Sequence, residues 1–142
     1  MATQNITNAV KNTFKYSSAT KPALYTNVKL DTTNEGFVLL STESPAATDI
    51  IIGSITNVEA CGNDSTWSVT VALSCPIVLM ACTGAIAIGD FLKLDTAGLL
   101  IAATRDTSAP STTIFSYGIS LKANASGGAT LPVLAMNQHI GV

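Results

Sequence analysis

Two aspartates within an apolar stretch are the first candidates for chemistry in this sequence. Asp90 and Asp95 lie in the segment GAIAIGDFLKLDTAGLL, residues 84–100. Two carboxylates can share general acid and base work only when both face one cleft. Their odd spacing would put them on opposite faces of a regular strand. Because Asp favours turns, we expect these two residues to mark the ends of a strand rather than a catalytic pair.

Other groups that could support catalysis or metal binding are few and scattered. The single histidine, His139, has no serine, cysteine or carboxylate beside it that would complete a nucleophilic site. The three cysteines, Cys61, Cys75 and Cys82, have no zinc-ligand spacing and are odd in number. We therefore expect no enzyme activity, no cofactor and no metal, and we expect Cys75 and Cys82 to be small buried hydrophobic residues.

The composition predicts a surface that is covered by other protein. Charged residues make up 11% of the chain and hydrophobic residues 47%, whereas an average domain has about 25% charged residues. The longest apolar runs are too short for a membrane helix, which needs about 20 residues, and the first residues contain no apolar core typical of a signal peptide. We expect a protein made in the cytoplasm that binds no membrane and whose surface contacts a partner or copies of itself.

The charges are divided unevenly along the chain. Residues 1–30 contain four lysines and no acid, whereas the remainder contains three basic residues and all nine acids. We interpret residues 1–22 as an extended basic arm and residues 23–142 as a single β-domain, with a frayed, solvated terminus as the alternative for the arm. The lysines lack the interleaved aromatic residues and arginines of a nucleic-acid site, so no nucleic-acid partner is expected.

The rest of the chain has the two-residue periodicity of short β-strands. In residues 24–30, Leu24, Val28 and Leu30 share one face, and residues 49–74 form a predicted hairpin with Trp67 on its inward face. One helical turn is expected near residues 44–49. The further strands are expected at about residues 36–42, 76–82, 85–95, 99–103, 114–122 and 130–136. Eight or nine short strands predict an all-β barrel or sandwich.

The second half of the chain resembles a known family. It reads CPIVLMACTGAIAIGDFLKLDTAGLLIAA and then YGISLKANASGGATLPVLAM, which is similar to the small decoration (cement) proteins of tailed bacteriophage heads. In that family a stretch ai-x-x-GD-x-v-x-x-d-x-x-G precedes an iGva…a…Gg…v-x-v ending. The resemblance covers about residues 50–136 and departs from the pattern at YGIS, where the family more often has Gly-Val-Ala. The matching positions are Ala85, Ile86, Gly89, Asp90, Asp95, Gly98, Gly118, Gly127 and Gly128.

The resemblance implies a structural, non-enzymatic protein of the virion, with a β-tulip-like fold. Such a protein is assembled in the host cytoplasm, binds the outer surface of the expanded capsid and bridges neighbouring major capsid proteins. It implies a homo-oligomer, with a trimer favoured. The arm would add a strand to a capsid sheet or lie along its surface, and its expected capsid-binding residues are Lys11, Phe14, Lys15, Tyr16 and Lys21.

Two other functions are alternatives to this one. A lectin-like or adhesin-type β binding module would suit the Thr, Ser and Asn content, but it needs exposed aromatic rings. The Trp and Tyr residues are few: Trp67, Tyr16, Tyr25 and Tyr117. An enzyme with paired carboxylates would need Asp90 and Asp95 to face each other.

Overall fold

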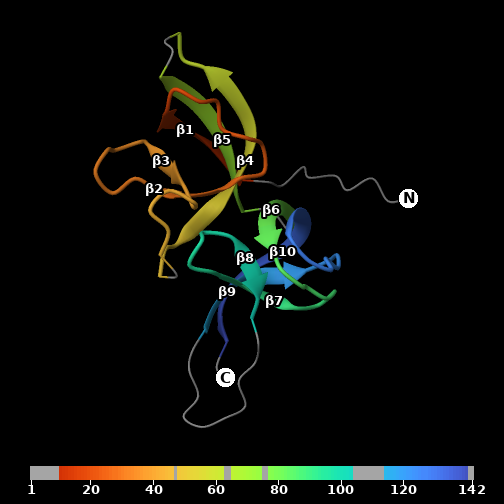
Figure 1. The fold of residues 1–142 in the computed structure, drawn as a ribbon. Helices are drawn as coiled ribbons and strands as arrows, with labels where there is room; N and C mark the ends of the chain where they lie inside the picture. Colours follow the sequence, from red (N-terminus) through yellow and green to blue (C-terminus); the bar gives the residue numbers. More distant parts are fainter. Residues whose placement is uncertain (1–9, 47, 63–64, 75–76, 104–113, 141–142) are drawn as a thin grey trace.

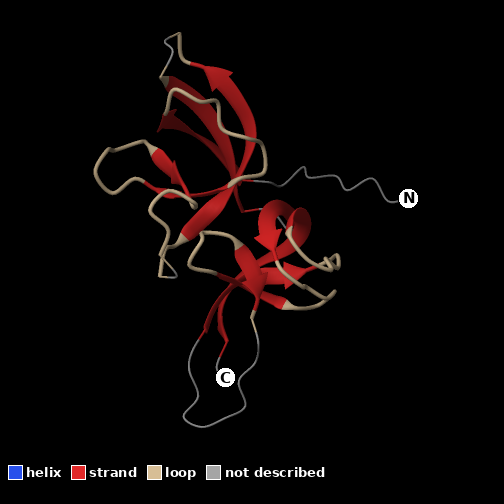
Figure 2. Ribbon diagram, viewed as in Figure 1, coloured by secondary structure: helices blue, strands red, loops and turns tan. Residues whose placement is uncertain are grey.

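The computed structural model describes residues 10–46, 48–62, 65–74, 77–103 and 114–140. These residues form ten strands, and Figure 2 shows strands and loops but no helix among them. The strands make two five-stranded sheets, of which the second closes into a barrel (Figure 1). The predicted all-β class is therefore confirmed. The strands are β1 (Val10–Ser17), β2 (Asn27–Leu30), β3 (Val38–Leu40), β4 (Ile51–Ala60), β5 (Thr66–Ser74), β6 (Ile77–Thr83), β7 (Phe91–Leu94), β8 (Leu100–Ala102), β9 (Ile114–Ser120) and β10 (Gly128–Ile140).

The first five strands form the N-terminal sheet, in the order β1-β5-β4-β2-β3. The expected hairpin is present as the antiparallel pair β4 and β5. The sheet curls until its two edge strands meet, where the Lys15 N–H donates a 2.9 Å hydrogen bond to the Gly36 carbonyl and Lys15 bridges to Phe37. The curled sheet encloses a core of Tyr16, Val28, Val38, Ile55, Val58, Val69 and Val71.

The last five strands form the C-terminal barrel, in the order β10-β6-β8-β7-β9. The pairs are antiparallel except for one parallel bridge between Cys82 and Leu100, which joins β6 to β8. Alternate side chains fill the interior, so Leu92 and Leu94 are buried together as their spacing predicts. At Gly118 a Cβ atom would overlap the Leu134 carbonyl, so this position in the barrel wall requires glycine.

The barrel packs against one end of the N-terminal sheet (Figure 1). Ile51 at the start of β4 and Ala72 near the end of β5 belong to the same buried cluster as the barrel residues. The shared cluster means that the two halves bury apolar surface against each other.

The strand expected over residues 24–30 begins only at Asn27. A turn occupies Leu24 and Tyr25, so Leu24 and Leu30 are 48% and 52% exposed while Val28 is fully buried. The expected strand is therefore shorter than predicted, and Leu24 lies outside it. The turn and the strand end interrupt the alternation.

Two further local predictions need correction. The described residues of the segment 44–49 form turns and bends but no helix. The single strand expected over residues 85–95 is broken by a turn, in which the Asp90 N–H donates to the Ala87 carbonyl at 3.2 Å. Only β7 of that segment is a strand.

The predicted boundary of the basic arm is also corrected. Residues 10–17 are not a free arm, because β1 pairs with β5 along its whole length, from Val10 opposite Ser74 to Ser17 opposite Thr66. The arm was expected over residues 1–22, and its first nine residues lie outside the described part of the chain.

Candidate binding surfaces

The structure separates the five residues expected to bind a capsid. Successive β1 side chains alternate between the two faces of the sheet. Lys11 and Lys15 are exposed, whereas Phe14 is half-buried and Tyr16 is buried in the core of the N-terminal sheet. Lys21 is exposed in the connection between β1 and β2. The three lysines are therefore accessible to a partner, and the two aromatic residues are parts of the fold.

Tyr16 lies at the seam of the N-terminal sheet, which is the line where its two edges, β1 and the chain leading into β3, meet. Its hydroxyl donates a 2.9 Å hydrogen bond to Glu43 Oε1, and Glu43 Oε2 accepts a 2.8 Å bond from the Leu40 backbone N–H. Burial raises the pKa of Tyr16, and the hydrogen bond to Glu43 raises it further. On the same seam, Lys15 Nζ lies 5.9 Å from the centroid of the Phe37 ring. These contacts assign Tyr16 and Glu43 a structural role.

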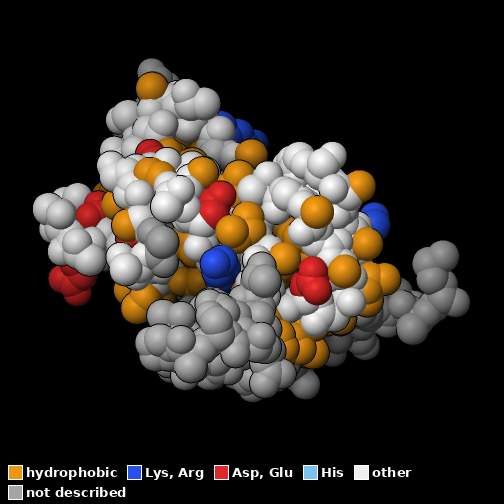
Figure 3. All heavy atoms as spheres, turned by 60° about the horizontal axis from the view of Figure 1, so that its bottom comes forward, with side chains coloured by type: hydrophobic (Ala, Val, Ile, Leu, Met, Phe, Trp, Pro, Cys, Tyr) orange, Lys and Arg blue, Asp and Glu red, His pale blue; other side chains and the backbone are white. Residues whose placement is uncertain are grey.

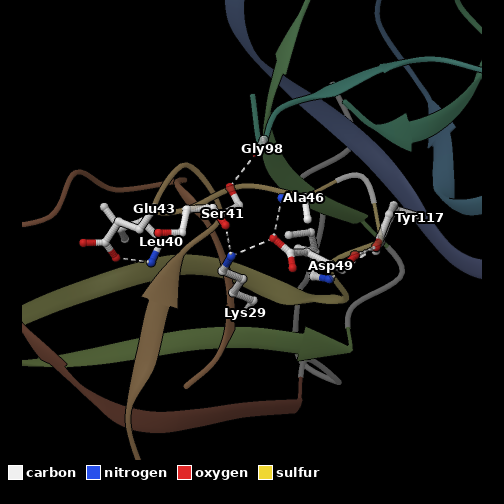
Figure 4. Close-up of polar contacts among 10 residues, drawn as sticks. Lys29, Leu40, Ser41, Glu43, Ala46, Asp49, Gly98 and Tyr117 are labelled. Carbon is white, nitrogen blue, oxygen red and sulfur yellow. Dashed lines mark hydrogen bonds and ion pairs between the residues drawn. The ribbon is translucent and has the colours of Figure 1, made fainter. Parts of the chain in front are cut away.

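A partly buried ion pair is the only salt bridge found among the described residues. Lys29 Nζ lies 2.6 Å from Asp49 Oδ2 and donates a second bond, of 3.1 Å, to the Ser44 carbonyl. The same Asp49 oxygen accepts a 2.9 Å bond from the Ala46 N–H. Figure 4 shows the two side chains pointing toward each other, with Tyr117 on the far side of Asp49.

The ion pair holds a loop in place rather than a reacting group. The hydrogen bond from Lys29, followed by that from the Ala46 N–H, lowers the pKa of Asp49. The carboxylate is therefore charged at neutral pH and fastens the 44–49 segment onto β2. The sequence did not indicate this pair, because Lys29 alternates with apolar residues along its strand and its partner is 20 residues away in the sequence.

Three polar side chains make hydrogen bonds between the N-terminal half and the barrel. The Tyr117 hydroxyl donates to the Asp49 carbonyl at 2.5 Å, and the Ser41 hydroxyl donates to the Gly98 carbonyl at 2.6 Å (Figure 4). The side chain of Asn27, fully buried, makes two bonds to Ala81: Nδ2 donates to its carbonyl at 2.9 Å and Oδ1 accepts from its N–H at 3.0 Å. We call these contacts the junction.

A small cavity lies at the junction. Its volume is about 30 Å³, enough for about one water molecule. It is lined mainly by apolar side chains from both halves, among them Ile51, Val78, Met80 and Tyr117. Its size and lining suit packing between the halves rather than substrate binding.

The aspartates predicted to mark turns do so. Asp90 Oδ2 accepts a 2.7 Å hydrogen bond from the Ala87 N–H. Asp95 Oδ1 accepts from the Ala97 and Leu99 N–H groups at 2.8 and 2.9 Å. Asp64 and Asp106, which the sequence places in stretches typical of turns, lie outside the described part of the chain.

The candidate metal and thiol groups do not form a site in the part of the chain that is described. No group of three or more His, Cys, Asp or Glu residues there could hold a metal ion. Cys82 is buried as expected, and burial raises its pKa to about 11. Cys61 is exposed. Cys75 and the side chain of His139 are outside the described part.

The barrel exposes a row of apolar side chains, which we call the barrel stripe: Leu79, Pro132, Leu121 and Ile88. Leu79 and Pro132 are paired across β6 and β10, and the Leu121 N–H donates to the Pro132 carbonyl at 3.0 Å. The neighbouring Ser120 carbonyl accepts a 2.8 Å hydrogen bond from the Gly89 N–H. This bond brings the backbone of Ile88, which precedes Gly89, close to that of Leu121. Ile88 is 70% exposed, and Leu79 and Leu121 are each 38% exposed.

The surroundings of the barrel stripe carry little charge. Residues 77–103 and 114–140 contain four Lys, Arg, Asp or Glu residues, two acidic and two basic. Figure 3 shows hydrophobic side chains scattered over one face of the molecule among uncharged polar atoms, with some acidic and basic side chains between them. An apolar surface with balanced, sparse charges suits contact with another protein surface.

Among the described residues no helix is long and apolar enough to cross a membrane. No model of a known protein family matches the chain, and no curated protein matches it.

Proposed function

We propose that this protein is a structural component of a bacteriophage virion that binds the outer surface of the head. There it would stabilise the capsid by bridging major capsid proteins. The observation that carries the proposal is the barrel stripe, an exposed apolar row on a barrel with almost no charged side chains. This feature agrees with the resemblance of the second half of the sequence to decoration proteins.

The barrel stripe supplies the free energy of association in this proposal. Burial of apolar surface contributes about 25 cal/mol per Å². A closed barrel presents few free strand edges, so its contacts are made by side chains rather than by added strands. The rigid stripe therefore suits binding to a preformed apolar surface, as an assembled shell provides.

Self-association would multiply the attachment. A homo-oligomer, with a trimer favoured, presents several copies of each contact to one shell, and each bound copy raises the effective concentration of the others. Such an oligomer would span the boundaries between capsid proteins and resist their separation.

A lectin-like function has less support. Tyr16 and Tyr117 are buried, and the half-buried Trp67 uses its indole N–H in a 2.9 Å bond to the Ser18 carbonyl. Among the described Trp and Tyr side chains, only Tyr25 is exposed. A sugar-binding surface usually stacks its ligand on more aromatic area than one partly exposed ring offers.

Co-sedimentation with emptied, expanded heads of the phage that encodes the chain tests the proposal. Ile88→Ser removes the most exposed residue of the barrel stripe, and Ile50→Ser is the matched control, since Ile50 is 68% exposed but lies on the N-terminal half. We expect I88S to bind heads about tenfold more weakly, the effect of a truncated interface anchor, and I50S to bind like the wild type. Absence of wild-type binding would refute the proposed function.

A further inference from the structure

A tyrosine in an unfavourable backbone conformation lies at the surface of the N-terminal half. Tyr25 has φ of 63°, in the left-handed region where glycine and asparagine are favoured and bulky residues are rare. It occupies the third position of the turn Ala23–Thr26, where many turns carry glycine. Sequence reasoning read this segment as a strand, so the feature was not predicted.

The surrounding contacts hold the turn in this conformation. The Tyr25 N–H donates a 2.7 Å hydrogen bond to the Ile55 carbonyl, and the Thr26 hydroxyl donates to the Ala23 carbonyl at 2.9 Å. Pro22, which precedes the turn, is buried. These bonds fix the backbone, and any residue other than proline at position 25 could make the bond from its N–H.

The turn presents apolar side chains outward. Leu24 is 48% exposed and Tyr25 is 37% exposed, and neither belongs to the buried core clusters. Core packing therefore does not explain why a tyrosine stands where asparagine or glycine would fit with less strain. Strain retained at an exposed side chain is typical of a binding site.

The charge around the turn indicates the kind of partner. Lys21 is exposed three residues before Leu24, and residues 1–30 of the sequence contain no acid. A partner that accepts Leu24 and Tyr25 should therefore offer an apolar pocket with acidic groups at its rim.

We propose that Leu24 and Tyr25, the docking turn, insert into an apolar, acid-rimmed pocket on the protein shell of the head. This inference rests on the proposed function and adds to it a second contact, on the opposite half of the molecule from the barrel stripe. The barrel stripe supplies a broad apolar contact, whereas the docking turn supplies a protruding one.

The test compares two asparagine substitutions in the same head-binding assay. Tyr25→Asn removes the ring at a left-handed position that asparagine tolerates. Ser44→Asn is the matched control, because Ser44 is the other described non-glycine residue with positive φ, at 46°. Both variants should fold, with thermal midpoints near that of the wild type. We expect Y25N to lower the affinity for heads about tenfold, Tyr25→Phe to retain it, and S44N to leave it unchanged.

The outcomes distinguish this inference from the proposed function. Wild-type and Y25N proteins that bind heads equally would overturn the docking turn and leave the proposed function intact. Failure of the wild type to bind heads would overturn both. Binding of the wild type to a glycan array that Y25N loses would overturn the protein partner in favour of a sugar.

Discussion

The fully buried side chain of Asn27 should be one of the most sensitive single positions for the stability of this chain. Its amide satisfies both the N–H and the carbonyl of Ala81 across the junction. In Asn27→Ala both backbone groups lose a partner. Each loss costs about 1 to 1.5 kcal/mol at a site that water partly reaches, so the free energy of unfolding should fall by about 2 to 3 kcal/mol.

This loss can be converted into a thermal shift. The entropy of unfolding is about 2.1 cal/mol/K per residue, which for 142 residues is about 0.3 kcal/mol/K. The midpoint of N27A should therefore lie about 7 to 10 °C below that of the wild type. Asn57→Ala is the control, since Asn57 is exposed and bonds only Glu59 among described partners; it should change stability by less than about 0.5 kcal/mol.

The assay is thermal unfolding followed by two probes. The single tryptophan, Trp67, lies in β5 and reports on the N-terminal sheet, whereas far-UV circular dichroism reports on both halves. In the wild type the two transitions should coincide, because the junction couples the halves. An N27A midpoint equal to that of N57A would refute the argument that Asn27 joins them.

Three further predictions follow from the described contacts. Gly98→Ala should lower the free energy of unfolding by about 3 kcal/mol, because a Cβ atom there overlaps a backbone carbonyl of the N-terminal half. Gly84→Ala is the control, since Gly84 has a similar φ but open space around it, and it should lower the free energy by about 1 kcal/mol in thermal unfolding. Equal losses in the two variants would contradict the overlap. The ion pair with Lys29 lowers the pKa of Asp49 in the folded protein. The ion pair therefore contributes fully to stability above pH 3.8, the ordinary pKa of the group, and this contribution is lost as the pH falls through the lower pKa of the folded state. Asp49→Asn should therefore be less stable than the wild type by about 2 kcal/mol at pH 7, and the gap in urea unfolding should narrow below pH 3.8; a constant gap would exclude the ion pair. Native-state thiol labelling with peptide mapping should modify exposed Cys61 and spare buried Cys82, whose pKa is about 11; equal labelling would show that the barrel opens.

Local sequence patterns predicted the elements whose structure depends on neighbours in the chain. The hairpin of β4 and β5 followed from two-residue alternation around a Gly-Asn-Asp-Ser connection. Asp90 and Asp95 followed from the ability of aspartate to accept hydrogen bonds from nearby N–H groups. In each case the deciding interaction spans a few residues, or a single turn.

The features that the sequence did not predict depend on contacts between residues that are far apart in the chain. Lys29 is buried only because Asp49 neutralises it, and the alternation of its strand suggested the opposite. The uneven distribution of charge places Tyr16 in an extended arm, but the alternation of side chains around it predicts a strand. Phe14 and Tyr16 alternate with Lys11 and Lys15 as a half-buried strand requires, and β1 is that strand.

The most direct test of the central claim, that this chain binds the outer surface of a bacteriophage head, is an electron-microscopy reconstruction of the particles produced from the genome that encodes it. The proposed function predicts density for the two-part molecule on the outer surface of the head, repeated with the capsid symmetry, with the barrel stripe buried against protein. Density confined to the tail or to the interior of the head, or heads that lack the chain altogether, would contradict it.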